Sequence, residues 1–210
     1  MLEKLFDTLV SSIILYGCEV WGTYCNLKDT DPFEHLHIKF IKEILGIHSK
    51  ATNVACLSEL NRYPLKDKIK LLIFKFWDHI SNSPNTLVNK IYNNLPQNNR
   101  WYTTIKKWVS ELGLGYIIDN TNNIKNNITI IRQRINDQAM QNQHSSLTEN
   151  HKLLFNKNIL KFNQRPYYVV IGRFKSDRST ICKYRISAHS LAIERGRYRN
   201  IPRDDRLCPK

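Results

Sequence analysis

The sequence predicts a mainly α-helical protein, in which a helical bundle is followed by a small basic module of helix and extended chain. Three observations support this fold class. Apolar residues recur every three or four positions through most of the 210 residues, as they do on one face of a helix. Several of these segments begin and end at residues typical of helix termini. Only residues 167–171 form a convincing run of β-strand type.

The first two helices are predicted from their apolar faces and their ends. Gly22 ends the first helix. Its expected core face consists of Leu2, Leu5, Phe6, Leu9, Ile13 and Tyr16. Asp31 is the expected N-cap of the second helix, Pro32 its first residue, and Gly46 its end. Glu34 lies three residues after the cap, as in a capping box.

Further helices are predicted as far as residue 112. A short one covers residues 52–60. Pro64 begins a stronger fourth helix, which Pro84 interrupts. Its apolar face consists of Leu65, Ile69, Leu72, Ile73, Phe76, Trp77 and Ile80. A weaker helix over 86–95 and a better one over 101–112 complete the bundle.

The second half of the chain is less regular. Its predicted helices cover residues 124–135, 153–160 and 176–188. Residues 141–146 read as a linker, and residues 196–209 as extended chain. From these elements we expect a helical domain over 1–115, a polar helical connecting region over 116–164 and a basic C-terminal module over 165–210.

The positive charge is concentrated in the C-terminal module. The chain has a formal net charge of +14, and residues 165–210 contain 12 basic and 4 acidic residues. A net charge of +8 therefore lies in less than a quarter of the chain. A local field of this kind attracts polyanions such as nucleic acid or an acidic membrane surface.

Most of these cations are arginines, which favour bidentate contact with phosphate, and tyrosine and histidine rings among them can stack on unpaired bases. The candidate nucleic-acid-binding residues are Arg173, Arg178, Lys183, Tyr184, Arg185, His189, Arg195, Arg197, Tyr198, Arg199, Arg203 and Arg206. Composition alone gives equal weight to the alternative of a solvated basic tail.

No catalytic residues are predicted. A polymerase palm needs paired carboxylates that hold two metal ions. The only adjacent pair, Asp204 and Asp205, lies in an arginine-rich segment without a preceding apolar strand, so surface ion pairing explains it better. Cys18 and Cys56 fall on or beside apolar faces and are interpreted as buried structural cysteines.

A complete zinc site is not predicted either. Cys182 and Cys208 have His189 between them, but the chain offers no close pair of cysteines, which zinc sites commonly use. We therefore expect no cofactor. An odd number of cysteines, five, favours a reducing compartment. The first residues lack the basic region of a signal peptide, and no apolar run approaches the ~20 residues that span a bilayer. These features predict an intracellular protein of the nucleus or cytoplasm, with no membrane partner.

Four segments, in order, resemble the region after the polymerase palm in reverse transcriptases of non-LTR (LINE-type) retrotransposons of animals. The first includes the letters ILYGCEVWG over residues 14–22. The second combines 39–46 with 59–65, and the third has Phe-Trp at 76–77 and Arg-Trp at 100–101. The fourth covers residues 183–198 and ends in the letters RLCP at 206–209. Their order and spacing make the resemblance fairly specific.

The resemblance implies a role for each region. Residues 1–115 would form a thumb-like bundle that packs on the palm and grips a primer–template duplex. The basic module would lead into a zinc knuckle, with Cys208 as the first of four ligands and the others beyond Lys210. The family's Tyr/Phe-x-Asp-Asp motif is absent from this sequence. We therefore expect a fragment or degenerate copy that binds RNA, an RNA–DNA duplex or a DNA duplex and is not an enzyme by itself.

Two alternatives remain open. Either the chain is a helical protein-interaction module, or it is a non-functional remnant of a transposable element. In the first case the faces that packed on the missing palm would bind another protein, and Phe6, Phe40 or Trp77 would be left partly exposed. An independent enzyme is supported by no motif.

Overall fold

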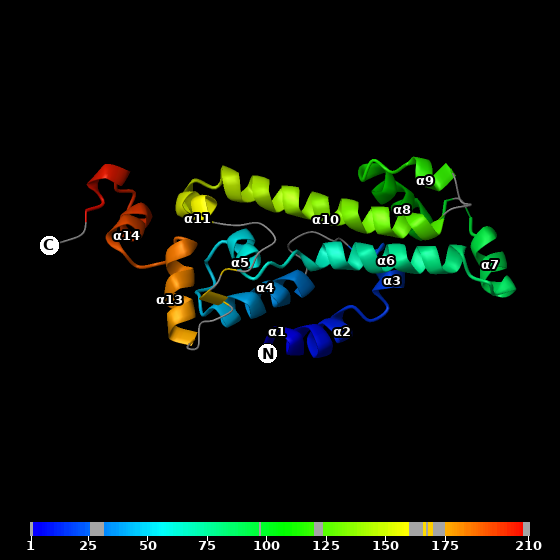
Figure 1. The fold of residues 1–210 in the computed structure, drawn as a ribbon, viewed down its shortest axis with the longest axis horizontal. Coiled ribbons are helices and arrows are strands. Elements are labelled where there is room, and N and C mark those ends of the chain that lie inside the picture. The colour runs from blue at the N-terminus through cyan, green and yellow to red at the C-terminus, as the bar shows by residue number, and fades with distance from the viewer. Residues whose placement is uncertain are drawn as a thin grey trace. The chain divides into compact units, whose positions relative to one another are not determined.

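The computed structural model describes residues 2–25, 32–96, 98–119, 124–159, 166, 168–169 and 175–207. Every regular element among these residues is helical, which confirms the mainly α prediction (Figure 1).

The chain forms two compact units. Unit 1 comprises Met1–His35 and Pro64–Met140, and unit 2 comprises Leu36–Tyr63 and Gln141–Lys210. Both units are discontinuous in sequence. The chain passes from unit 1 to unit 2 within helix α4 (Pro32–Leu45), returns to unit 1 at Pro64, and passes to unit 2 again within helix α10 (Ile124–Glu149). The expected domains were three consecutive stretches, so this division differs from them.

Unit 1 begins with a series of short helical segments. These are α1 (Leu2–Leu5), the π-helical turn η1 (Phe6–Val10), α2 (Ser11–Ile14) and α3 (Cys18–Trp21). Gly17 separates α2 from α3, and its φ of 64° lies in the left-handed region that glycine adopts without strain. The single predicted helix is therefore interrupted before Gly22.

The core face predicted for this first helix is wrong except at Phe6. Phe6 is buried, but the other five members, Leu2, Leu5, Leu9, Ile13 and Tyr16, are exposed. The buried apolar residues of α2 and α3 are instead Ile14 and Cys18. Apolar residues occur on both sides of this segment, so their spacing does not show which side is buried. The π turn at η1 has more residues per turn than an α-helix, which changes the positions that share one side.

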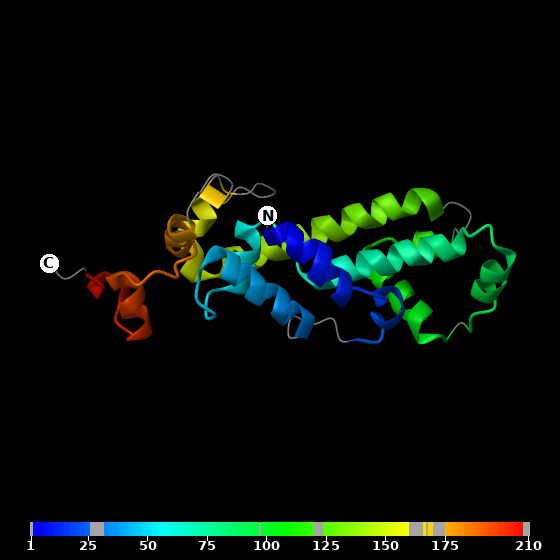
Figure 2. The same cartoon turned by 90° about the horizontal axis from the view of Figure 1, so that it is seen from below.

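The core of unit 1 is built on α6 (Leu65–Ser81) and α8 (Arg100–Glu111), together with the first part of α10. Figures 1 and 2 both show α6 running beside that part of α10. The buried residues are Leu65, Ile69, Ile73, Phe74, Trp77, Trp101, Ile105, Val109, Ile131 and Ile135. The predicted face of α6 is thus largely confirmed. Of the three residues expected to be partly exposed, Phe40 is part-buried, whereas Phe6 and Trp77 are buried.

Two shorter helices complete unit 1: α7 (Thr86–Asn93) and α9 (Tyr116–Asp119). Asn85 caps α7 and Asn99 caps α8, because each side-chain oxygen accepts hydrogen bonds from backbone N–H groups of the first turn. Asparagine therefore has a local structural role at both helix starts.

Unit 2 combines the end of α4 with α5 (Asn53–Glu59), the end of α10, and the following short helices. These are η3 (His151–Leu153), α11 (Leu154–Ile159), α13 (Lys175–Arg185), α14 (Ala192–Tyr198) and η4 (Arg203–Asp205). Its core consists of apolar residues from α4, α5, α10, η3, α13 and the turns beside them, among them Ile41, Leu45, Cys56, Leu147, Leu153, Cys182 and Ile186. The C-terminal module therefore shares one core with residues from the first third of the sequence.

Three local predictions in the second half are wrong. Residues 141–146 belong to α10, not to a linker, because Leu147 is buried in the core and glutamine is a good helix former. Residues 196–209 contain the end of α14 and the turn η4 instead of extended chain only. Tyr168 and Val169 are helical, not strand-like, and residues 167, 170 and 171 lie outside the described part of the chain.

Candidate nucleic-acid interface

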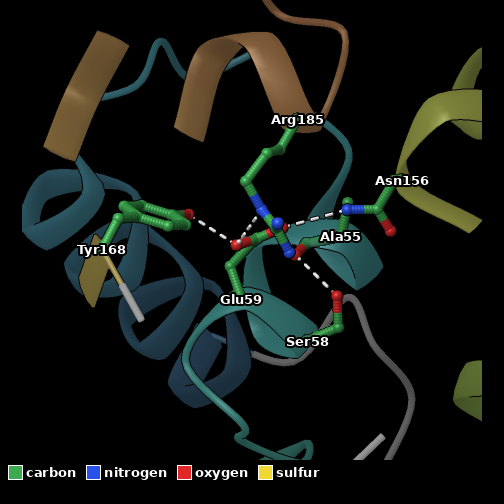
Figure 3. A network of polar contacts seen from close by, with 6 residues as sticks. All are labelled: Ala55, Ser58, Glu59, Asn156, Tyr168 and Arg185. Atoms are coloured by element: carbon green, nitrogen blue, oxygen red, sulfur yellow. Dashed lines mark hydrogen bonds and ion pairs between the residues drawn. The ribbon is translucent and has the colours of Figure 1, made fainter. Parts of the chain in front are cut away.

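A buried carboxylate holds the C-terminal end of helix α13. Glu59, at the end of α5, has no solvent exposure. The Nε–H of Arg185 donates to both of its oxygens, at 2.9 Å and 3.0 Å. Asn156 Nδ2 donates to Oε1 at 3.0 Å, and the hydroxyl of Tyr168 donates to Oε2. Figure 3 shows the three side chains meeting at Glu59.

This network determines the role of Arg185. Its side chain is only 15% exposed, so the arginine serves to compensate a buried negative charge. Burial, followed by the nearby charge of Glu59, strongly raises the pKa of Tyr168, so its phenol stays protonated and remains a donor. The structure therefore places Arg185 inside unit 2, and away from the surface where a phosphate would approach.

The corner after α13 presents an aromatic group. Ser187 adopts a left-handed φ of 53°, and the chain turns there between Tyr184 and His189. The two rings lie 5.1 Å apart with an interplanar angle of 31°. Phe155 of α11 meets Tyr184 edge-to-face at 5.6 Å. Tyr184 keeps 52% of its surface exposed, so its position is fixed by its neighbours while part of its ring stays accessible.

His189 is held in its neutral form. Its Nδ1 accepts a hydrogen bond from the backbone N–H of Leu191 at 3.3 Å. Burial lowers the pKa of His189, Glu194 opposes this effect, and Lys152 adds to the lowering. Near neutral pH the ring is therefore a flat aromatic surface and contributes no positive charge.

A pocket of about 500 Å³ opens beside this aromatic group. Phe155 and Tyr184 contribute rings to its lining, and Lys152, Arg197 and Arg206 contribute cations. Its volume lies within the range of small-ligand pockets. The lining combines the two kinds of side chain that a nucleotide requires, rings for a base and cations for a phosphate.

The two arginines of the pocket are positioned by specific contacts. Arg206 donates from Nε to the carbonyl of Ile201 at 2.8 Å, and its alkyl chain passes over Gly196. A Cβ at Gly196 would lie 2.5 Å from Cγ of Arg206, so only glycine permits this approach. Arg197 Nη2 lies 3.0 Å from Oε2 of Glu194, an ion pair on one turn of α14.

Four of the predicted residues line this pocket: Tyr184, His189, Arg197 and Arg206. The exposed residues Arg195, Tyr198 and Arg199 belong to α14 or follow it directly but are not part of the lining. Arg178 and Lys183 lie part-buried on α13. Arg173, the side chain of Arg203 and the proposed zinc ligand Cys208 are outside the described part of the structure.

Sequence reasoning missed the part of the pocket that η3 and α11 contribute. His151, Lys152 and Phe155 come from η3 and α11, in the stretch interpreted as a polar connecting region. A single lysine and a single phenylalanine carry no motif, and only the packing of η3 and α11 in unit 2 brings them beside Tyr184.

Within the described ranges, no three His, Cys, Asp or Glu side chains form a group that could hold a metal ion. Over the same ranges, no helix is both long and apolar enough to cross a membrane. Comparison of the chain with protein-family models, with curated proteins and with solved structures finds no match.

Proposed function

We propose that this protein binds nucleic acid through the surface of unit 2 formed by η3, α11, α13 and α14. The observation that carries the proposal is the pocket in which Lys152, Arg197 and Arg206 surround the rings of Phe155 and Tyr184. Cations supply the sequence-independent attraction to phosphates, and aromatic rings supply contacts to bases. The partner is RNA, or a duplex of RNA with DNA or of DNA.

The four segments that resemble non-LTR reverse transcriptases support an origin in such an element. In that family this region follows the polymerase palm, and contact with primer and template is its expected task. The pocket lining consists mainly of ring faces and hydrogen-bond donors, and its one carboxylate, Glu194, pairs with Arg197. We accordingly assign the chain a binding role and no catalytic step of its own.

The test is a filter-binding titration of the purified chain against single-stranded RNA, structured RNA and duplex DNA. The variant Arg195→Ala/Arg197→Ala/Arg199→Ala removes three cations from α14 and its end. A matched control, Lys68→Ala/Lys75→Ala/Lys107→Ala, removes three exposed cations from unit 1. We expect the arginine variant alone to weaken binding strongly at low salt. Equal affinities of the two variants would reject the proposed surface.

Substitution is preferable to truncation in this test. Cys182 of α13 and Ile186, which directly follows α13, are fully buried in the core of unit 2. Deleting the chain from residue 165 onward would remove these side chains and expose the apolar residues that they cover. A loss of binding in the truncated chain would then not distinguish a lost contact from an unfolded unit.

A second candidate function has its own observation. The exposed residues Leu2, Leu5, Leu9, Ile13, Tyr16 and Val20 follow one another at intervals of three or four positions on the N-terminal segments of unit 1. Exposed apolar residues in such number favour contact with a protein, and in the resembled enzymes the partner would be the palm. Sedimentation velocity at increasing concentration tests it, because self-association that Ile13→Asp abolishes would support an interaction surface.

A further inference from the structure

We propose that the pocket at Tyr184 takes one unpaired nucleotide, with its base on the aromatic side and its phosphate on the cations. The inference rests on the proposed function and adds a preference to it. Nucleic acid would be held at this site only where a base is free of its partner strand.

The aromatic side of the pocket is suited to a base. Phe155 and His189 contact the Tyr184 ring and fix its orientation, while about half of its surface remains accessible. Because the Tyr184 ring is already held in place, stacking a base on it costs little further side-chain entropy. A base inside a duplex already stacks on its neighbours and pairs with its partner, so it is not available to this ring.

The charge of the pocket is suited to a phosphate. The lining contains three cations, Lys152, Arg197 and Arg206, and one acidic side chain, Glu194, which pairs with Arg197. The lowered pKa of His189 leaves that ring neutral near pH 7. Arg206 uses Nε and Nη1 for backbone carbonyls, and an arginine has five N–H donors, so donors remain for an anion.

Lys152 precedes Tyr184 in the chain, whereas α14 follows it. It belongs to η3, whose backbone is fixed at its start, because Asn150 Oδ1 accepts from the N–H of Lys152 at 3.0 Å. The pocket thus draws its cations from η3, from α14 and from the chain after η4. Cations from separate elements can enclose one phosphate, whereas cations spaced along one helix track a backbone.

Tyr198 provides a matched control for Tyr184. It is 64% exposed, it lies outside the pocket lining, and the guanidinium of Arg197 covers its ring at 5.0 Å. Both tyrosines are therefore surface residues of the same basic region. Removing either ring changes neither charge nor core packing, and only Tyr184 lines the pocket, so a larger effect of Tyr184→Ala than of Tyr198→Ala reports on the pocket.

The experiment measures the affinity of the full chain for a labelled single-stranded RNA and for a duplex of the same sequence. We expect Tyr184→Ala to weaken single-strand binding about tenfold or more, the scale of one base stack, and to leave duplex binding unchanged. Tyr184→Phe keeps the ring and should retain the affinity. Tyr198→Ala should weaken single-strand binding much less than Tyr184→Ala does, and no more than it weakens duplex binding, because Tyr198 lies outside the pocket lining. Lys152→Ala should reduce the salt slope for single strands by about 0.7, the contribution of one phosphate contact.

The results separate this inference from the proposed function. Equal effects of Tyr184→Ala and Tyr198→Ala, or an equal loss for duplex and single strand, overturn the pocket while general nucleic-acid binding stands. Absence of all nucleic-acid binding by the wild-type protein rejects both. Titration with 5′-GMP and 5′-UMP distinguishes a nucleotide of RNA from a free one. If the monophosphates occupy the pocket and RNA does not, the ligand of the pocket is a free nucleotide. Displacement by polyglutamate that Tyr184→Ala leaves unaffected would reveal a site for acidic peptides and overturn the proposal.

Discussion

Arg185 and Glu59 lie 126 positions apart in the chain and form a buried ion pair, with Nε of the arginine 2.9 Å from Oε1 of the carboxylate. The pair connects α13 to α5 in the interior of unit 2. It also sets the place of the aromatic corner, because Tyr184 directly precedes Arg185 on the last turn of α13. One arginine of the basic module is therefore a structural residue, and the surface cations around it are held by the helix that it fixes.

This pair leads to a prediction about stability. Arg185→Ala leaves Glu59 buried without its charge partner, which should lower the free energy of unfolding by about 3–5 kcal/mol. Arg195→Ala removes an exposed arginine from α14 and should change it by less than about 0.5 kcal/mol. Urea unfolding followed by circular dichroism measures both. Similar small effects in the two variants would mean that Arg185 is solvated.

The exposed face of the N-terminal segments leads to a second prediction. Ile13 is 79% exposed and Ile14 is 9% exposed, although they are neighbours with the same side chain. Ile14→Ala should destabilise the chain by about 2–4 kcal/mol because it leaves a cavity, whereas Ile13→Ala should be close to neutral. Thermal unfolding of the two variants compares them directly. The reverse order would restore the core face that the sequence pattern predicted.

Cysteine reactivity provides a third prediction. Burial raises the pKa of the Cys18, Cys56 and Cys182 thiols, in each case to about 12, so these groups remain protonated and shielded at pH 8. Cys25 is exposed. A brief iodoacetamide pulse followed by peptide mass mapping should modify Cys25 and spare Cys18, Cys56 and Cys182, all of which should react in urea. Rapid native labelling of Cys56 or Cys182 would show that the core of unit 2 is open.

The stability of unit 2 should fall in mild acid. The pKa of His189 is lowered by burial first, and that of His48 by burial and then by Lys152. A histidine whose pKa is lower in the folded state binds fewer protons there than in the unfolded chain. It therefore has no effect well above pH ~6.5, the unfolded value, and destabilises the fold as the pH decreases below it. The expected result is a smaller unfolding free energy at pH 5.5 than at pH 7.5.

The variant His189→Asn isolates one of these groups. Because asparagine does not titrate, the difference in unfolding free energy between pH 7.5 and pH 5.5 should be smaller in the variant than in the wild-type protein. Other titrating groups contribute equally to both chains and cancel in the comparison. An unchanged pH dependence would mean that His189 has the same pKa in the folded and unfolded states.

Local signals in the sequence predicted much of the helical structure. Pro64 and the apolar spacing after it identified α6, and the glycine at position 46, with its φ of 65°, identified the end of α4. These features depend on residues a few positions apart. The burial of Leu2, Leu5, Leu9 and Ile13 was mispredicted because a spacing of three and four identifies an apolar face without showing what covers it.

The pocket could be predicted only in part for a related reason. Clustered arginines and tyrosines pointed to residues 173–206, and four of the named side chains do line the pocket. Separating Arg185 from them required knowledge of Glu59, and recognising Lys152 and Phe155 required the packing of η3 and α11 in unit 2. Such contacts between distant parts of the chain leave no mark in the local sequence.

The most direct test of nucleic-acid binding is the salt dependence of the wild-type protein's affinity for single-stranded RNA. Fluorescence anisotropy between 50 mM and 300 mM salt should give a linear decrease of log K with log salt concentration. A slope of about −2 is expected if the three pocket cations each contact a phosphate, at about 0.7 per contact. Binding that is absent at the lowest salt, or that does not change with salt, would contradict the account and leave the basic module as a solvated surface.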